Sequence, residues 1–287
     1  MSEKERRAVD GCAIFYKTSR FRLIENYLLE YNQNALQRAD FKKTEDIYNR
    51  VMNKDNIAVL TMLEKKDTQE LVLVANSHIH WDPTFADVKL VQVGMLMDEI
   101  KRFAAKHVGN QNERLPTVIC GDFNSTPVSG VYEFLSKGTI QQDHDDFGNY
   151  VYGDYTTDGL SHDLSLKSAY GHVGELPFTN YTITFKGVLD YIWYTNNTLD
   201  VHSLLGPVDD NYLKNVVGFP NAHFPSDHIP LISYFKIRRS SKETDEAAVK
   251  PSERHIMEKG YSNEQSISHS TSRDNDISIN EGNRLNK

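Results

Sequence analysis

Short apolar runs rich in β-branched and aromatic residues recur along most of this 287-residue chain. Two of them, residues 56–63 and 71–76, flank a charged turn at residues 65–69, a pattern that predicts a β-hairpin. Similar runs predict strands at residues 11–30, 116–120, 181–185, 188–194, 201–205 and 231–237. Most of these runs are long enough for strands but too short for helices, so the core must be built largely from β-sheet.

Residues 84–107 have a different pattern, in which apolar side chains recur at steps of three and four. This spacing predicts an amphipathic helix, and Thr84 and Asp87 have the spacing of its N-cap and N3 residues. A shorter helix is expected at residues 130–135. Predicted strands outnumber predicted helices, and the helices lie between strands along the chain. We therefore expect an α/β fold in which two packed, mixed β-sheets are flanked by helices.

The composition changes abruptly after Ile237. The following segment is rich in Ser, Asn, Glu, Lys and Arg and contains almost no aromatic residues. Such a segment buries too little apolar surface to become ordered, so residues 239–287 are expected to form a disordered polar tail and residues 1–238 a single domain. No apolar run reaches the roughly 18 residues of a membrane span, and residues 1–7 do not resemble a signal peptide. We expect a soluble intracellular protein with no membrane partner.

The formal net charge of the chain is −8, and nearly all of it falls on residues 1–238. An acidic protein repels a phosphate backbone, so a nucleic-acid substrate requires bound cations or a local basic groove. The two cysteines, Cys12 and Cys120, each lie in an apolar segment, which favours reduced thiols over a structural zinc site.

The tetrapeptide Gly121-Asp122-Phe123-Asn124 follows the predicted strand that ends at Cys120. With the two-residue period of a strand, Asp122 and Asn124 project from one face at the end of the sheet, while Phe123 points into the core. The carboxylate can bind a divalent cation or take a proton from water, and the carboxamide can donate a hydrogen bond to a phosphate oxygen. The alternative is a turn in which both side chains accept hydrogen bonds from backbone amides.

Asp190 is the one carboxylate in an otherwise aromatic and branched run, and Asp227 and His228 directly precede the last predicted strand. A buried charge is costly without a partner. We therefore expect Asp190 to orient His228 across the sheet, while Asp227 faces a metal ion or water. The alternative is a core histidine with satisfied hydrogen bonds and an aspartate in a turn.

His78 and His80 end another predicted strand and share one face of it. A histidine near a leaving oxygen can donate a proton or a strong hydrogen bond to it, and we assign this role to His78. For His80 and Trp81 we expect packing alone.

In this order and spacing, the His78 segment, the five residues from Gly121, the Asp190 strand and Ser226-Asp-His228 resemble the endonuclease/exonuclease/phosphatase superfamily, which includes deoxyribonuclease I, abasic-site endonucleases and inositol polyphosphate phosphatases. The resemblance covers residues 9–237. A finer resemblance is to the poly(A)-specific exonuclease branch of carbon catabolite repressor protein four. The stretches that carry it are Val9 to Cys12, Asn49 to Ala58, His78 to Pro83, Gly174 to Asn180, Gly218 to Asn221 and Phe224 to Pro230.

The resemblance implies a deoxyribonuclease I-like sandwich that hydrolyses phosphodiester bonds with Mg²⁺, with a two-ion site in the complete domain. It implies catalytic roles for Asp122, Asn124, His78, Asp190 and His228, metal binding by Asp122, Asn124, Asp227 and His228, and substrate binding by Pro83, Phe185 and Asn124. Pro83 and Phe185 would wedge and stack an adenine. The implied substrate is the poly(A) tail of mRNA, the implied partners are subunits of a deadenylase complex, and the implied compartments are the cytoplasm and the nucleus.

The sequence departs from the family pattern near its start. The family's principal Mg²⁺ ligand is a Glu in a Leu-Gln-Glu segment, whereas the one Gln-Glu pair here, Gln69-Glu70, opens a strand after a charged turn. The leucine-rich repeats that dock this branch to its partner are not found either. We therefore expect an N-terminally truncated catalytic domain that has, on its own, negligible deadenylase activity and poor solubility.

Two other functions fit the same residues. One is a small-molecule phosphatase or a sphingomyelinase-like diesterase on the same scaffold, because the fold does not fix the substrate. The other is a catalytically inactive RNA-binding remnant. This alternative is favoured because the sequence has no recognisable counterpart of the family's Glu ligand.

Overall fold

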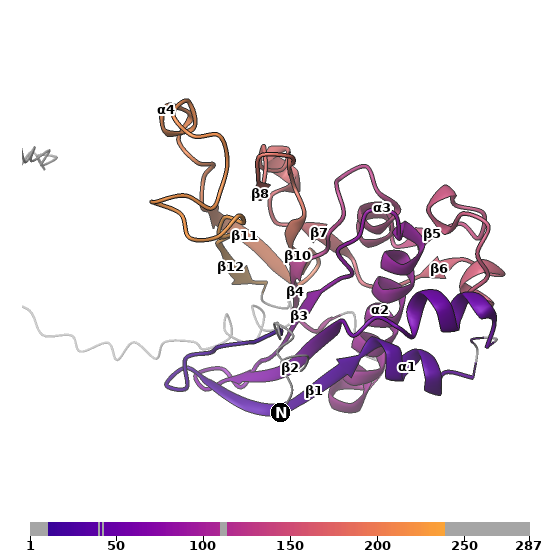
Figure 1. The fold of residues 1–287 in the computed structure, drawn as a ribbon. Coiled ribbons are helices and arrows are strands. Elements are labelled where there is room, and N and C mark those ends of the chain that lie inside the picture. The colour runs from indigo at the N-terminus through magenta and orange to yellow at the C-terminus, as the bar shows by residue number, and fades with distance from the viewer. Residues whose placement is uncertain (1–10, 40, 42, 110–113, 239–287) are drawn as a thin grey trace, which may run out of the picture. The chain divides into compact units, whose positions relative to one another are not determined.

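The computed structural model describes residues 11–39, 41, 43–109 and 114–238 (Figure 1). The tail expected at residues 239–287 lies outside the described residues. The strand predicted at residues 11–30 is correct only in its second half, because the first strand, β1, runs from Phe21 to Glu30. Before it, Ala13 is tied to the sheet by a side chain, with Asn76 Nδ2 donating to its carbonyl at 3.0 Å.

The framework is a six-stranded sheet with the strand order β1-β2-β3-β4-β10-β7. β2 and β3 form the predicted hairpin, in which Leu60 lies opposite Ala75. Among the described strands of this sheet, only β3 and β4 pair in parallel, so the sheet is mixed, as expected. The strands other than β1 are β2 (Ile57–Lys65), β3 (Leu71–His78), β4 (Thr117–Asp122), β10 (Asp190–Thr195) and β7 (Leu166–Ser168).

Two helices, α2 (Ala86–Val108) and α3 (Gly130–Lys137), cover one face of this sheet (Figure 1). α2 is the crossover between β3 and β4, which a parallel pair requires. Its apolar stripe packs on the strand side chains that alternate toward it, so Leu60, Ala75 and Leu96 are fully buried in one core. Within the part of the chain that the structure describes, no helix combines the length and apolarity needed to cross a membrane.

The long predicted helix is confirmed, but its predicted capping pair is wrong. Phe85 occupies the N-cap position of α2 without a side-chain cap. Thr84 instead donates its amide and its hydroxyl to Asp82 Oδ1, at 2.9 and 2.8 Å, which closes a turn before the helix. Asp87 forms a buried ion pair with Arg50. The local signal failed because a partner distant in the sequence takes this carboxylate.

The opposite face of the sheet is covered at β4 and β10 by an antiparallel pair, β11 (Leu199–Leu204) and β12 (Ser233–Ile237). Tyr194 of β10 packs against Phe235 of β12 with ring centroids 5.1 Å apart. The predicted α/β architecture of two packed sheets with flanking helices is thus confirmed. As far as the described residues go, the second sheet is a two-stranded antiparallel pair and not a mixed sheet.

The remaining elements are short and lie in the connections. They are α1 (Tyr31–Gln37), the π-helical turn η2 (Ile47–Val51), the paired strands β5 (Thr139–Ile140) and β6 (Leu160–Ser161), the hairpin strands β8 (Asn180–Tyr181) and β9 (Lys186–Gly187), the 3₁₀ turns η4 (Asp145–Phe147), η5 (Gly153–Thr156) and η6 (Gly171–Val173), and α4 (Asp210–Leu213).

The strand predicted at residues 181–185 is wrong. Residues 182–185 form the turn between β8 and β9, in which Thr182 Oγ1 accepts the amides of Thr184 and Phe185 at 3.3 and 3.0 Å. These local hydrogen bonds from the backbone to a side chain compete with strand pairing. The segment therefore forms a turn despite its β-branched residues.

Candidate active site

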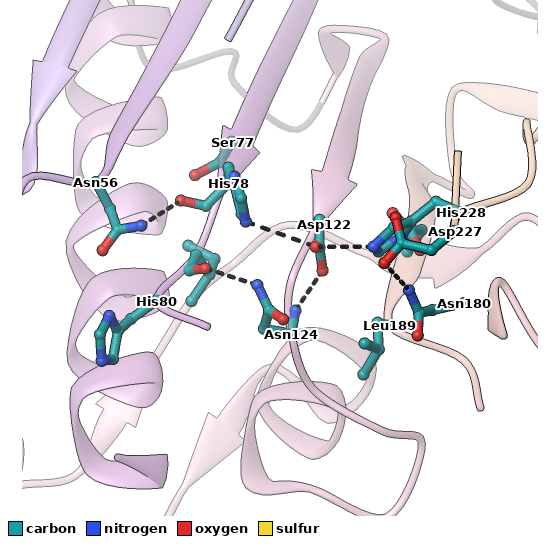
Figure 2. Close-up of polar contacts among 12 residues, drawn as sticks. Asn56, Ser77, His78, His80, Asp122, Asn124, Asn180, Leu189, Asp227 and His228 are labelled. Carbon is teal, nitrogen blue, oxygen red and sulfur yellow. Dashed lines mark hydrogen bonds and ion pairs between the residues drawn. The ribbon is translucent and has the colours of Figure 1, made fainter. Parts of the chain in front are cut away.

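Three neighbouring strands of the six-stranded sheet, β3, β4 and β10, each have a polar residue at the same end of the sheet (Figure 2). β3 and β4 are parallel, so their last residues, His78 and Asp122, lie opposite each other in the ladder. β10 runs antiparallel to β4, so its first residue, Asp190, also lies opposite Asp122. Because residues in register project from the same face, the three side chains form a row in the order His78, Asp122, Asp190.

His228 joins this row from the segment before β12. Its Nδ1 donates to Asp190 Oδ2 at 2.7 Å, and its Nε2 lies 3.8 Å from Asp122 Oδ2. On the other side, His78 Nε2 lies 3.6 Å from the same Asp122 oxygen. The predicted hydrogen bond between Asp190 and His228 is therefore present, and two imidazoles flank the Asp122 carboxylate.

A buried threonine that the sequence analysis missed fixes Asp190. Thr179 is 1% exposed. Its Oγ1 donates to Asp190 Oδ2 at 2.6 Å and accepts the amides of Leu189 and Asp190 at 2.9 and 3.0 Å. Asp190 Oδ2 thus accepts from both Thr179 and His228, which aims the carboxylate. The sequence gives no local signal for this role, because Thr179 lies in an irregular segment and reaches Asp190 only in the folded chain.

Asp227 lies beside His228, on the side of the site where β8 passes (Figure 2). Its Oδ2 accepts from Asn180 Nδ2 at 3.2 Å, and its backbone carbonyl accepts the Tyr181 amide at 3.0 Å. Asn180 also forms an isolated β-bridge with His228. β8 therefore holds Asp227 and His228 through its backbone and through Asn180, a second residue that sequence reasoning did not assign to the site.

Asn124 forms the turn after β4 with a φ of 46°, in the left-handed region. Its amide donates to Asp122 Oδ1 at 2.8 Å, and its Nδ2 donates to Ile79 O at 2.9 Å. The turn interpretation is correct for Asp122, which accepts a backbone amide with Oδ1, but wrong for the Asn124 side chain, which donates to a carbonyl. The other oxygen of Asp122 faces the two imidazoles. One N–H of the Asn124 carboxamide is already engaged, so only the second is available for a phosphate.

The Asn124 carbonyl accepts a hydrogen bond from Lys89 Nζ at 2.6 Å. Lys89 belongs to α2 and is buried beneath the turn. The role of Lys89 could not be predicted from the sequence, because α2 contains two other lysines and only the fold shows which one is buried. Lys89 brings a positive charge under the residues that follow β4.

A buried amide of α2 fixes the end of β3. Gln92 Oε1 accepts the His80 amide at 2.9 Å, and Gln92 Nε2 donates to Asn56 Oδ1 at 3.1 Å. Asn56 Nδ2 in turn donates to the His78 carbonyl at 3.1 Å. His80 is buried, in agreement with the packing expected of it. Trp81 is 68% exposed, so the packing expected there is wrong; it lies in the irregular segment between β3 and α2.

The charges of the site influence one another. Burial, together with the nearby Asp190 carboxylate, raises the pKa of Asp122 above the ordinary value of an aspartate. The hydrogen bond to Asp190 raises the pKa of His228 to about 9. At neutral pH and without a bound cation, His228 is therefore protonated and offsets part of the repulsion between the two carboxylates.

The same residues can hold a metal ion. Asp122, Asp190 and His228 each offer one ligand atom, and these atoms all lie within 4.8 Å of one another. Carboxylate oxygens suit hard divalent cations, so the donor set fits a cation of this class. Of the expected metal ligands, Asp122 and His228 belong to this triad, whereas Asp227 and Asn124 lie beside it.

The two residues expected to hold an adenine lie on two different loops. Pro83 is exposed in the loop that follows His78. Phe185 is 38% exposed in the turn that follows Asn180. His78 and Asn180 lie on opposite sides of Asp122 (Figure 2), so the site is flanked by both loops.

Glu70, the glutamate with the Gln-Glu context, is not part of the site. It directly precedes β3, at the opposite end of that strand from His78. Lys65 Nζ and Thr68 Oγ1 donate to its Oε2 at 3.1 and 2.7 Å. Its carboxylate therefore serves the β2–β3 turn.

Comparisons with known proteins agree with this geometry. A family model described as the Endonuclease/Exonuclease/phosphatase family matches residues 4–228. The chain is 54% identical over 259 residues to a protein of Mycosarcoma maydis and 53% identical over 257 residues to one of Schizosaccharomyces pombe, both named CCR4-Not complex 3′-5′-exoribonuclease subunit Ccr4. These matches cover 84% and 83% of this chain but 39% and 37% of the relatives, so the chain spans less than half of their length.

Solved structures are similar as well. ANGEL2, described as a 2′,3′-cyclic phosphatase in complex with adenosine-2′,3′-vanadate, has a TM-score of 0.60 and 27% sequence identity, over 77% of this chain and 68% of that chain. The human Nocturnin catalytic domain with a bound sulfate anion has a TM-score of 0.52 and 21% identity, over 77% of this chain and 62% of that chain, a likeness of fold alone. Both agree with the fold class expected from the sequence.

Proposed function

This chain belongs to the endonuclease/exonuclease/phosphatase family, and we propose that it forms part of the catalytic domain of a Mg²⁺-dependent 3′-to-5′ exoribonuclease that shortens poly(A). The observation that carries the proposal is the row of His78, Asp122 and Asp190 at one sheet edge, with His228 hydrogen-bonded to Asp190. Two curated relatives, each more than half identical over the matched residues, are named as 3′-5′-exoribonuclease subunits.

The side chains of the row suit the proton and charge movements of phosphodiester hydrolysis. Asp122, whose Oδ2 faces both imidazoles, can bind the cation that activates the attacking water. His228, kept positively charged by Asp190, can donate a hydrogen bond to a phosphate oxygen as negative charge grows there. His78, on the other side of Asp122, can donate to the leaving 3′ oxygen.

His228 can act either as a neutral metal ligand or as a charged donor to the phosphate. The hydrogen bond to Asp190 favours the protonated form, so we assign the donor role to His228 and cation binding to the carboxylates of Asp122 and Asp190. A Mg²⁺ ion held there would polarise the phosphate and lower the pKa of a bound water. Asp227 and Asn124 are close enough to the triad to orient waters around it.

The proposed substrate is single-stranded RNA that ends in adenylates. Pro83 and Phe185 lie on the loops that flank the site, and an exposed aromatic ring is a suitable platform for one base. The relatives are named as subunits of the CCR4-Not complex, which supports a role of this protein in such a complex.

A second candidate function is removal of a 2′,3′-cyclic phosphate from RNA. The observation that favours it is the likeness to ANGEL2, whose structure holds adenosine-2′,3′-vanadate. The chemistry differs in the bond that is cleaved, while the demand for a positive hydrogen-bond donor and an acidic cation site is the same.

A comparison of substrates separates these functions. The protein would be the chain extended upstream by a segment that carries the family's Leu-Gln-Glu motif, because we expect the main Mg²⁺ ligand of the family outside these residues. In Mg²⁺, it should shorten an RNA that ends in adenylates faster than it acts on RNA 2′,3′-cyclic phosphate, inositol phosphates or sphingomyelin. Turnover of the cyclic phosphate alone would favour the second candidate, and RNA binding without any turnover would favour an inactive remnant.

A further inference from the structure

The turn that carries Phe185 is fixed on both of its sides. Asn180 and Tyr181 of β8 pair with Gly187 and Lys186 of β9. Inside the turn, the Thr182 amide donates to the Phe185 carbonyl at 2.7 Å, and the Phe185 amide donates to Thr182 Oγ1 at 3.0 Å. The backbone position of Phe185 is therefore well defined.

The Phe185 ring lies against Gly187. A Cβ atom added to Gly187 would be 2.8 Å from Phe185 Cζ, 3.3 Å from Cε1 and 3.5 Å from Cε2, and these ring atoms are the three nearest. The backbone of Gly187 does not have the positive φ that only glycine tolerates well, so its conformation does not require glycine. The Phe185 ring, and not the backbone conformation, is what leaves no room for a side chain at residue 187.

The same hairpin is joined to the candidate active site. Asn180, the partner of Gly187 in the ladder, donates to Asp227 and forms a β-bridge with His228. Thr179, the residue before β8, donates to Asp190. These contacts therefore fix the position of the Phe185 ring relative to the side chains that are proposed to act on the phosphate.

We propose that Gly187 is a specificity-determining positioning residue: the space left by its missing side chain seats the Phe185 ring in the orientation in which its exposed surface stacks on an adenine. This inference rests on the proposed function, in which Phe185 is the base platform. An aromatic ring stacks well only when its face is parallel to the base, so a shift of the ring costs affinity in proportion to the stacking strength of the base. Adenine, with the larger ring system, should lose more than uracil.

The test is the ratio of AMP to UMP affinity, measured by NMR titration of the 287-residue chain in Mg²⁺. Neither nucleotide has a phosphodiester bond, so the proposed exonuclease reaction does not consume them during the titration. Gly187→Ala should lower the ratio by about threefold or more, and Phe185→Ala should lower it to a similar extent. In the double variant, Gly187→Ala should add nothing to the effect of Phe185→Ala, because the ring that it displaces is absent.

Gly206→Ala is the matched control, because a Cβ at Gly206 meets nothing within 4 Å and its φ is not in the positive range. The control should leave the ratio unchanged. If Gly187→Ala destabilises the fold, Phe185→Ala in the same chain should restore stability by removing the clash, and failure to do so would overturn the proposed contact.

The outcomes separate the two levels of the proposal. An unchanged ratio in Gly187→Ala, together with a lowered ratio in Phe185→Ala, would overturn the role of Gly187 and leave Phe185 as the platform. An unchanged ratio in Phe185→Ala would overturn the platform itself, and with it the role of Gly187. Equal losses for AMP and UMP in Gly187→Ala would show a general disturbance of the hairpin and would also refute the proposal.

Discussion

At the scale of single residues, the candidate site depends on uncharged groups that aim the charged ones. Thr179 shows this most clearly, because one buried hydroxyl satisfies two backbone amides and also donates to Asp190. Asp190 then accepts from His228, so a small polar side chain controls the direction of an imidazole that it does not touch.

Replacement of this hydroxyl tests its importance. Thr179→Val leaves the amides of Leu189 and Asp190 without their partner, and we expect a loss of about 1–3 kcal/mol in the free energy of unfolding. Thr179→Ser keeps the hydroxyl and should stay within about 1 kcal/mol of the parent chain. Urea unfolding of both variants measures the difference. Equal losses would mean that the methyl group, and not the hydroxyl, matters.

The protonation of His228 is a second prediction at this scale. In metal-free protein its pKa is about 9, since Asp190 accepts its hydrogen bond. The raised pKa stabilises the fold fully below the ordinary histidine value of about 6.5, and this contribution is lost as the pH rises through about 9. Asp190→Asn should move the pKa toward 6.5, as followed by NMR titration in EDTA. Asp200→Asn, remote from the site, is the control, and an unchanged pKa in Asp190→Asn would refute the orienting pair.

At the scale of elements, α2 is positioned by contacts of its first turn that do not resemble a helix cap. Asp87, 3% exposed, accepts from Arg50 at 2.6 and 2.8 Å and also from Tyr152. Arg50 comes from η2 and Tyr152 from the segment before η5, so one carboxylate joins three parts of the chain. The same helix supplies Lys89 and Gln92 to the turns around the site.

Removal of Arg50 should therefore be costly. Arg50→Met leaves the Asp87 charge buried with a weaker set of partners, and we expect a loss of about 3–5 kcal/mol in unfolding free energy. Arg22→Met, which breaks an exposed pair with Glu64, is the control and should cost about 1 kcal/mol or less. Urea unfolding would contradict this account if both variants lost the same amount.

Patterns within one segment predicted the elements whose structure depends on near neighbours, namely the β2–β3 hairpin and α2. They failed at Asp87, where Arg50 competes with the cap, and at Thr182, where a side chain closes a turn in a β-branched segment. The roles of Thr179 and Lys89 could not be predicted either, because an isolated threonine or a lysine in a helix has the same local pattern whether buried or exposed.

At the scale of the whole molecule, the site is a consequence of strand order. Parallel β3 and β4 place His78 and Asp122 at one edge, and antiparallel β10 adds Asp190. Because a polar residue at the end of an apolar strand is visible in the sequence, the members of this row could be predicted. Their distances and hydrogen-bond partners depend on neighbours from other strands and could not.

The pH dependence of Mg²⁺ affinity should show whether Asp122 binds the cation. Protons compete with the cation for Asp122, whose pKa is raised above the ordinary aspartate value of about 3.9. Mg²⁺ affinity should therefore be constant at neutral pH and fall as the pH decreases through that raised pKa, which calorimetric titration can follow. Affinity that stays constant down to the ordinary aspartate value would show that Asp122 is not a ligand.

The central claim is that the Asp122 row is the centre of metal-dependent phosphodiester hydrolysis. Its most direct test is the rate at which the upstream-extended chain shortens an RNA ending in adenylates in Mg²⁺, compared among the parent chain, Asp122→Asn and the control Asp200→Asn. We predict that EDTA abolishes the reaction, that Asp122→Asn lowers kcat by about two orders of magnitude or more with RNA affinity retained, and that Asp200→Asn has no effect. An Asp122→Asn variant that binds RNA and keeps the parent kcat would contradict the claim.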